Sequence, residues 1–97
     1  GFRVLLLVKR GWHINANPAS SPYLIPTEIR GDVRNVSYPP GKSTSFAFSK
    51  EPLSVYDGEV TLEGEASGDA NEVILIYQAC DETRCLSPVQ RELPLPR

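Results

Sequence analysis

The sequence predicts an all-β domain, an antiparallel β-sandwich, from three observations. Nine prolines and seven glycines interrupt the chain, so no segment keeps a helical apolar period for long. Many short apolar runs, several rich in β-branched residues, alternate with turn-forming residues. The 97 residues are 40% hydrophobic, which suits one globular domain with one core. We therefore treat residues 1–97 as a single domain.

The strands are predicted in chain order from local pattern. Residues 2–8 form a run of leucine and valine, and residues 60–65 alternate apolar and polar side chains. In residues 73–77, Val73, Leu75 and Tyr77 would share one face. Residues 67–71 have a turn composition, which predicts a hairpin between the last two strands. Further candidates are residues 23–29, 33–38, 45–48, 53–56 and 90–93.

Charge and hydropathy exclude several classes. The net charge is −2 with no long run of one sign, and nucleic-acid binding requires a basic face. The longest apolar run, residues 4–8, is far too short to span a bilayer. The chain begins abruptly in strand-like sequence, so we expect a domain excised from a larger protein. Nothing in the sequence indicates more than a monomer.

The two cysteines, Cys80 and Cys85, carry the most specific chemical signal. If residues 73–79 form a strand and the chain returns after Arg84, both cysteines lie at the mouth of a hairpin. Opposed residues of such a hairpin have Cα atoms about 4.5–5.5 Å apart, which is within disulfide range. The spacing therefore permits a bridge.

A bridge here has two possible roles. A ring this small removes little unfolded-chain entropy, about 2 kcal/mol, so a local pair is better suited to being made and broken than to stapling the fold. A structural clip, or two free thiols, remain the alternatives. Two thiolates and one distant histidine fall short of a four-ligand zinc site, and we expect no metal and no cofactor.

Neighbouring charges differ between the two cysteines. Asp81 and Glu82 disfavour a Cys80 thiolate, whereas Arg84 favours a Cys85 thiolate. No helix N-terminus is predicted nearby to lower the pKa of either thiol. We therefore expect a pair that is attacked by a partner's thiolate, with Cys85 as the partner-facing sulfur.

Four segments resemble a known family. Tyr77-Gln78-Ala79-Cys80 followed by Cys85-Leu86-Ser87-Pro88 is similar to the active-site segment of the DsbD N-terminal domain family of thiol:disulfide interchange proteins, and more so to the related disulfide bond corrector domains. Residues 11–17 (Gly-Trp-His-Ile-Asn-Ala-Asn), 23–27 and 53–58 match in the family's order. Together the four segments extend over residues 11–88, most of the chain.

The resemblance implies an immunoglobulin-like sandwich in the periplasm or another extracytoplasmic space, within a membrane-anchored bacterial protein. It implies that Cys80 and Cys85 are the catalytic pair. They would accept electrons from the transmembrane portion of the parent protein and pass them to periplasmic thiol oxidoreductases or thioredoxin-like domains. Some family members shield the disulfide with an aromatic cap; here Phe48 is the nearest candidate and Phe46 the rival. A non-catalytic interaction or scaffold module with a structural clip is the alternative.

Other residues are given structural roles. His13, the only histidine, is expected to form structural hydrogen bonds rather than to act as a general base. Trp12 and Tyr56 are expected in the core. Tyr77 is expected in the core or lining the redox pocket. Asn15 and Asn17 are expected in turns.

Overall fold

The computed structural model describes residues 1–96, and all regular structure in that range is β-strand. The strands are β1 (Phe2–Leu7), β2 (His13–Asn15), β3 (Glu28–Arg30), β4 (Val33–Ser37), β5 (Lys42–Thr44), β6 (Leu53–Tyr56), β7 (Glu59–Ala66), β8 (Glu72–Tyr77), β9 (Ala79–Cys80) and β10 (Val89–Pro94). Every strand pair is antiparallel. The predicted all-β, immunoglobulin-like antiparallel sandwich is confirmed.

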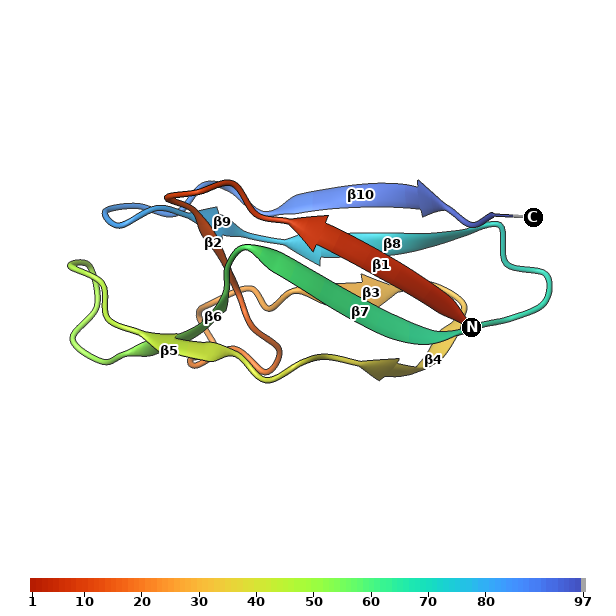
Figure 1. Cartoon of the computed structure of the whole chain (residues 1–97), viewed down its shortest axis with the longest axis horizontal. Helices are drawn as coiled ribbons and strands as arrows, with labels where there is room; N and C mark the ends of the chain where they lie inside the picture. Colours follow the sequence, from red (N-terminus) through yellow and green to blue (C-terminus); the bar gives the residue numbers. More distant parts are fainter. Residues whose placement is uncertain (97) are drawn as a thin grey trace.

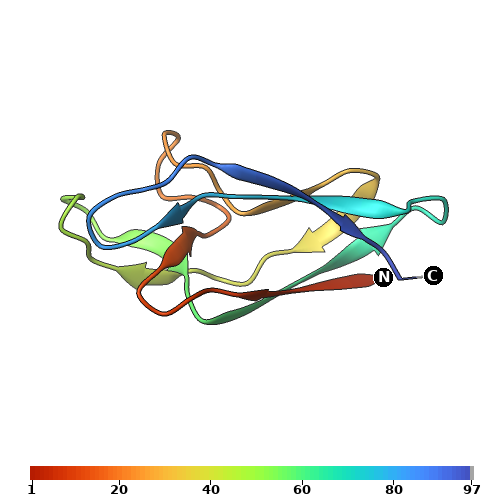
Figure 2. The same cartoon turned by 90° about the horizontal axis from the view of Figure 1, so that it is seen from above.

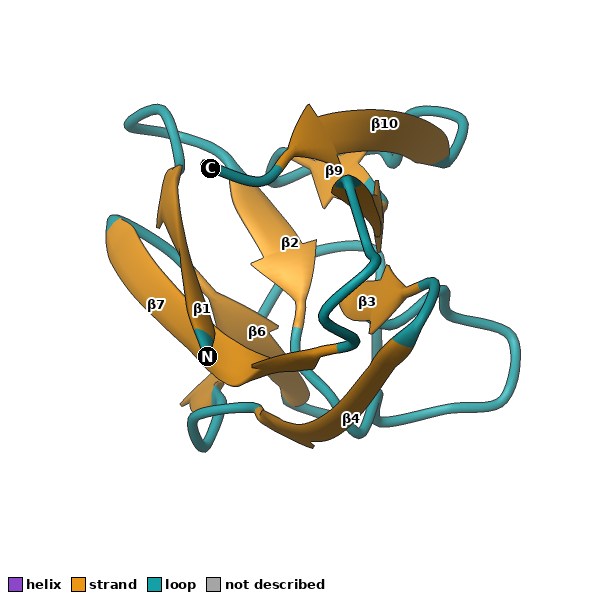
Figure 3. Cartoon of the chain, turned by 90° about the vertical axis from the view of Figure 1, so that its right-hand side faces the viewer, coloured by secondary structure: helices purple, strands orange, loops and turns teal. Residues whose placement is uncertain are grey.

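Two three-stranded sheets form the layers of the sandwich. One has the order β1-β7-β4 and the other β10-β8-β3 (Figures 1 and 3). A four-stranded sheet, β5-β6-β2-β9, lies at one end. In it β2 pairs with β6 on one side and with β9 on the other, so β2 connects the two halves of the molecule at that end.

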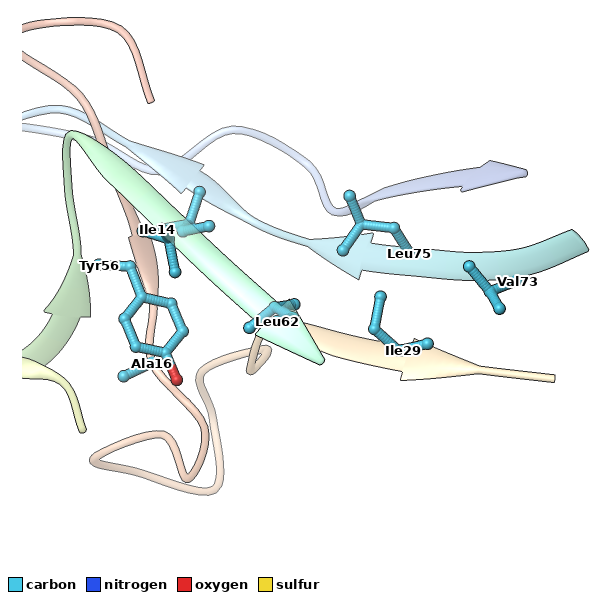
Figure 4. Close-up of a cluster of buried hydrophobic side chains, with 8 residues drawn as sticks. Ile14, Ala16, Ile29, Tyr56, Leu62, Val73 and Leu75 are labelled. Atoms are coloured by element: carbon cyan, nitrogen blue, oxygen red, sulfur yellow. The ribbon is translucent and has the colours of Figure 1, made fainter. Parts of the chain in front are cut away.

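The core lies between the layers and follows the alternation of the strands. Leu62 of β7 is fully buried, and Val73 and Leu75 of β8 face it from the opposite layer (Figure 4). In β1, alternate residues turn inward, whereas Leu5 and Leu7 point outward and are 54% and 75% exposed. The remaining labelled side chains of the cluster are Ile14, Ala16, Ile29 and Tyr56.

The predicted hairpin between residues 60–65 and 73–77 is wrong. Both strands exist, as β7 and β8, but β7 pairs with β1 and β4, and β8 pairs with β10 and β3. Because both edges of β7 are occupied, the turn at residues 67–71 carries the chain across to the other layer (Figure 2). Local turn composition does not distinguish a hairpin from such a crossing.

Three local predictions also need correction. The strand expected at residues 23–29 is confined to Glu28–Arg30, and Tyr23 is exposed. The strand expected at residues 45–48 is a loop; the strand, β5, ends just before it at Thr44. Asn15 is not a turn residue but the buried last residue of β2.

The molecule is elongated, with principal extents of 44 × 21 × 20 Å. Both ends of the described chain lie at one end of the long axis, and the loop that follows β9 lies at the other (Figures 1 and 2). The described residues include no helix long and apolar enough to cross a membrane.

Candidate functional site

Cys80 and Cys85 form a disulfide at the end of the sandwich away from the termini. Cys80 is the last residue of β9, and an isolated antiparallel bridge pairs it with Cys85. Their Cα atoms are 4.0 Å apart. The bridge that the spacing permits is present, and the alternative of two free thiols is wrong.

The segment between the cysteines is a tight hairpin tip. The Asp81 amide donates to the Arg84 carbonyl at 2.9 Å. The Asp81 Oδ1 atom accepts from the amides of Thr83 and Arg84, each at 2.9 Å, and from the Thr83 hydroxyl at 3.1 Å. These donors, the Thr83 amide first, lower the pKa of Asp81, and Arg84 adds an ion pair at 3.6 Å. The Arg84 charge is therefore directed at Asp81.

The two sulfur-bearing residues differ sharply in exposure. Cys80 is 1% exposed, whereas Cys85 and the residues around it lie on the surface. Cys80 is buried because β9 pairs with β2, whose three residues are all buried. The bridge therefore joins one inner and one outer cysteine.

His13 of β2 lies directly opposite Cys80 in the register. Its ring stacks on Phe46 with centroids 4.1 Å apart and planes 20° apart. Its side chain is 4% exposed, and its Nε2 atom is buried with no hydrogen-bond partner among the described residues. Burial lowers the pKa of His13, and the charges of Asp57 and Asp81 oppose that shift. His13 is thus stacked on Phe46, and at Nε2 the structural hydrogen bonding expected of this residue is not found among the described residues.

The loop between β5 and β6 supplies the aromatic cover of His13. Phe46 is the nearer ring, and Phe48 lies further out, 6.4 Å from His13 and 5.4 Å from Phe46. The Ser49 amide donates to the Phe46 carbonyl at 3.2 Å, and the Ser49 hydroxyl donates to the Glu51 carbonyl at 2.8 Å, which folds the loop on itself. Of the two cap candidates, Phe46 contacts the strand beside Cys80, and Phe48 is an outer, partly exposed ring.

Gln78 joins the cysteine hairpin to β2, a role that the sequence pattern did not predict. Its Oε1 atom accepts from Asn15 Nδ2 at 3.2 Å and from the Ile25 amide at 3.4 Å, and its Nε2 atom donates to the Leu86 carbonyl at 3.3 Å. Asn15 also donates to the Ile25 carbonyl at 2.9 Å. Gln78 and Asn15 lie in the two most specific family-like segments, and this was the sequence signal that could have pointed to their contact.

Two cavities flank the hairpin, and they separate the predicted site residues. A cavity of about 470 Å³ is lined by His13, Thr44, Phe46, Asp57 and the tip residues 81–83, together with Gly11, Trp12 and Val55. Tyr77 lies instead in an apolar groove of about 530 Å³, with Ala79 and Leu86. Tyr77 is half-buried and packs against the core. The half-buried Trp12 lines both cavities and is not part of the central core cluster.

The described residues contain no group of three or more His, Cys, Asp and Glu side chains placed to hold a metal ion. The chemistry that this arrangement offers is that of a disulfide with one surface-exposed end. No family model, curated protein or solved structure matches the chain.

Proposed function

We propose that the domain exchanges thiols and disulfides through Cys80 and Cys85, relaying electrons to or from partner oxidoreductases in an extracytoplasmic compartment. The observation that carries the proposal is the exposure difference within the bridge: Cys85 lies on the surface at a protruding hairpin, and Cys80 is buried. Thiol–disulfide exchange requires a thiolate to reach one sulfur while the other leaves. Because only one end of the bridge is accessible, Cys85 is the sulfur that is attacked and Cys80 is the sulfur that leaves.

In the proposed exchange, Cys85 is the residue that the partner attacks. The thiolate of a partner cysteine attacks the Cys85 sulfur, the partner–Cys85 bond forms, and the Cys80–Cys85 bond breaks with its electron pair moving to Cys80. The thiolate of the partner's second cysteine then attacks the sulfur of the partner's first cysteine in the mixed disulfide. The partner closes its own disulfide, and Cys85 leaves as a thiolate. The domain is reduced by two electrons, and the partner is oxidised to a disulfide.

Two further observations support a relay. The ring closed by the bridge contains only the hairpin tip, so we expect the strand pairing of the two layers to persist when it opens. The family-like segments also meet in space: residues 13–15 and the Gln78–Cys80 segment are adjacent in one sheet and linked by the Asn15–Gln78 hydrogen bond. Resemblance to the DsbD N-terminal family suggests the periplasm, thioredoxin-like partners and a membrane-anchored parent protein.

The test is a trapping experiment. A thioredoxin-like domain whose resolving cysteine is replaced by alanine is mixed with the oxidised protein, and the mixed disulfide is mapped by peptide mass spectrometry. We expect the partner on Cys85. As matched controls, Cys80→Ala leaves only the outer thiol and Cys85→Ala only the buried one. After activation with an aromatic disulfide reagent, only the Cys80→Ala protein should couple rapidly to the partner.

The alternative, a scaffold module whose bridge is a clip, gives different results. It predicts no trapped complex, slow reduction by thioredoxin-like proteins and a reduction potential below about −300 mV. Those three results together would overturn the relay.

A further inference from the structure

The electron pair released in the proposed exchange arrives on a buried sulfur. Cys80 is 1% exposed, and an isolated thiolate in such a place is strongly disfavoured because burial penalises the charged form. The nearest charged group along the chain, Asp81, is an anion and makes the penalty larger. Arg84 does not compensate, since its guanidinium pairs with Asp81. Exchange at Cys85 therefore requires a group that can hold a proton beside Cys80.

His13 lies in that position. It is the direct cross-strand partner of Cys80 in the β2–β9 pair, and opposed residues of an antiparallel pair project from the same face with Cβ atoms about 4.5–5.5 Å apart. Among the described residues, its Nε2 atom is buried without a hydrogen-bond partner, as are Asn15 Oδ1 of the same strand and Thr44 Oγ1 on the wall of the adjacent cavity, whereas the backbone of β2 pairs on both sides. A buried imidazole nitrogen without a partner costs free energy, so its retention beside a disulfide calls for an explanation.

We infer that His13 is the acid–base partner of Cys80, holding the proton that the Cys80 sulfur gains and loses when the bridge opens and closes. The inference rests on the proposed exchange at this disulfide. As the Cys80–Cys85 bond breaks, the imidazole donates an N–H hydrogen bond to the forming thiolate. A proton from water then completes either the imidazolium–thiolate pair or the neutral imidazole–thiol pair. On reoxidation the same proton returns to water.

The surroundings of His13 favour this role in the open bridge. Burial lowers the pKa of His13, which favours the neutral ring while the bridge is intact. Asp57 and Asp81 act in the opposite direction, and Glu82 lines the same cavity. Lys42 partly offsets Asp57 through an ion pair at 3.3 Å. A new negative charge on Cys80 would add to this acidic surround and stabilise the imidazolium.

The covering ring fixes the imidazole in place. Phe46 stacks on the face of His13, and Phe48 lies beside Phe46 with its ring nearly parallel to both. The cavity of about 470 Å³ beside His13 has the exposed residues Glu82 and Thr83 on its wall, which provides a route for protons from solvent.

The first test measures thiol reactivity in single-cysteine proteins. In Cys85→Ser, which keeps the buried Cys80 thiol, alkylation by iodoacetamide is followed from pH 5 to 10, with and without His13→Gln. We expect His13→Gln to raise the pKa of Cys80 and to slow alkylation at pH 7 about ten-fold, because one pKa unit is a factor of ten. In Cys80→Ser, which keeps the outer Cys85 thiol, the same substitution should leave the pH profile unchanged. Equal profiles for Cys80 with and without His13 would overturn the inference.

The second test needs no substitution, so it is independent of whether His13→Gln folds. His13 is the only histidine, and its ring resonances are therefore unambiguous in a proton NMR titration. In the oxidised protein we expect one titration step. In the protein reduced with dithiothreitol we expect a second inflection at the pH where the Cys80 thiol ionises, since the two groups titrate as a coupled pair. Identical curves in both redox states would contradict the proposal.

Both tests use small reagents, which separates them from the proposed function. If the three results that overturn the relay are obtained while His13 still controls the pKa of Cys80, the relay is wrong and the proton partnership stands. If partners couple to Cys85 but His13→Gln leaves the pKa of Cys80 unchanged, the relay stands and this inference is wrong.

Discussion

Tyr56 is a buried side chain whose hydroxyl forms two hydrogen bonds. It donates to the Pro39 carbonyl at 2.7 Å and accepts from the Asn17 amide at 3.2 Å. Both contacts tie loops to β6 at the end of the sandwich that carries the disulfide. Burial raises the pKa of Tyr56 above the ordinary value of 10.0.

This shift predicts a loss of stability at alkaline pH. The folded protein holds the Tyr56 proton more tightly than the unfolded chain does, so above pH 10 the unfolded chain binds fewer protons and the free energy of unfolding falls as pH rises. Tyr56→Phe should cost about 1–2 kcal/mol at pH 7, because two hydrogen bonds are lost, and should flatten the decline between pH 9 and 11. Urea unfolding at several pH values measures both effects; parallel curves for the two proteins would contradict the linkage.

Thr27 offers a nearly isosteric test of one buried hydrogen bond. Its side chain is fully buried, and its hydroxyl donates to the Asn15 carbonyl at 2.6 Å. That carbonyl also accepts from the Thr27 amide, so it keeps a partner in Thr27→Val. We expect Thr27→Val to lower the free energy of unfolding by about 1 kcal/mol, measured by thermal or urea unfolding. A loss of several kcal/mol would mean that Thr27 positions β2 through more than this bond.

At the scale of elements, β7 is the strand on which one layer depends, because it pairs with β1 on one side and β4 on the other. Leu62 lies at its centre with no exposed surface. Leu62→Ala should destabilise the protein by about 2–5 kcal/mol, through lost burial and a cavity between the layers. Thr61→Ala, at the neighbouring position on the outer face, is the matched control and should change stability by less than about 1 kcal/mol. Similar losses at both positions would contradict the assigned facing of β7.

The elements also show what local sequence could and could not predict. Strands with strong alternation or dense β-branched content, such as β1, β7 and β8, were predicted to within a residue or two. The strand β2 was missed because His13 and Asn15 are polar, and both are buried through stacking and long-range hydrogen bonds. The pairing of β7 and β8 was wrong because turn composition carries no information about which sheet the next strand joins.

In the candidate site, too, the local feature could be predicted from the sequence and the long-range contacts could not. The bridge between Cys80 and Cys85 could be predicted because both lie in one hairpin, where spacing determines approach. The neighbours of the bridge come from β2 and from the loop after β5, about 65 and 35 residues before Cys80 in the chain, respectively. Only the folded arrangement could place His13 opposite Cys80 and Phe46 on His13, or divert Arg84 to Asp81.

At the scale of the whole molecule, the small ring closed by the Cys80–Cys85 disulfide predicts that the free energy of unfolding depends little on the redox state of the protein. Reduction should lower the free energy of unfolding by only about 2 kcal/mol, since the bridge closes six residues. Urea unfolding with and without dithiothreitol measures the difference, and the amide NMR spectrum of the reduced protein should change mainly around residues 79–86 and 13. Cooperative unfolding on reduction would instead identify the bridge as a structural staple.

The elongated shape has a consequence for any partner fused to this domain. The disulfide and both ends of the described chain lie at opposite ends of a long axis of 44 Å. A tethered partner therefore has to reach back along the whole body. A flexible Gly/Ser-rich linker spans about 5.5 Å times the square root of its length, so about 60 residues match that distance. Effective concentration at Cys85 should peak near this length and fall to nothing for linkers too short to make the return. Tags or fluorophores on either terminus, by the same geometry, leave the reactive end unobstructed.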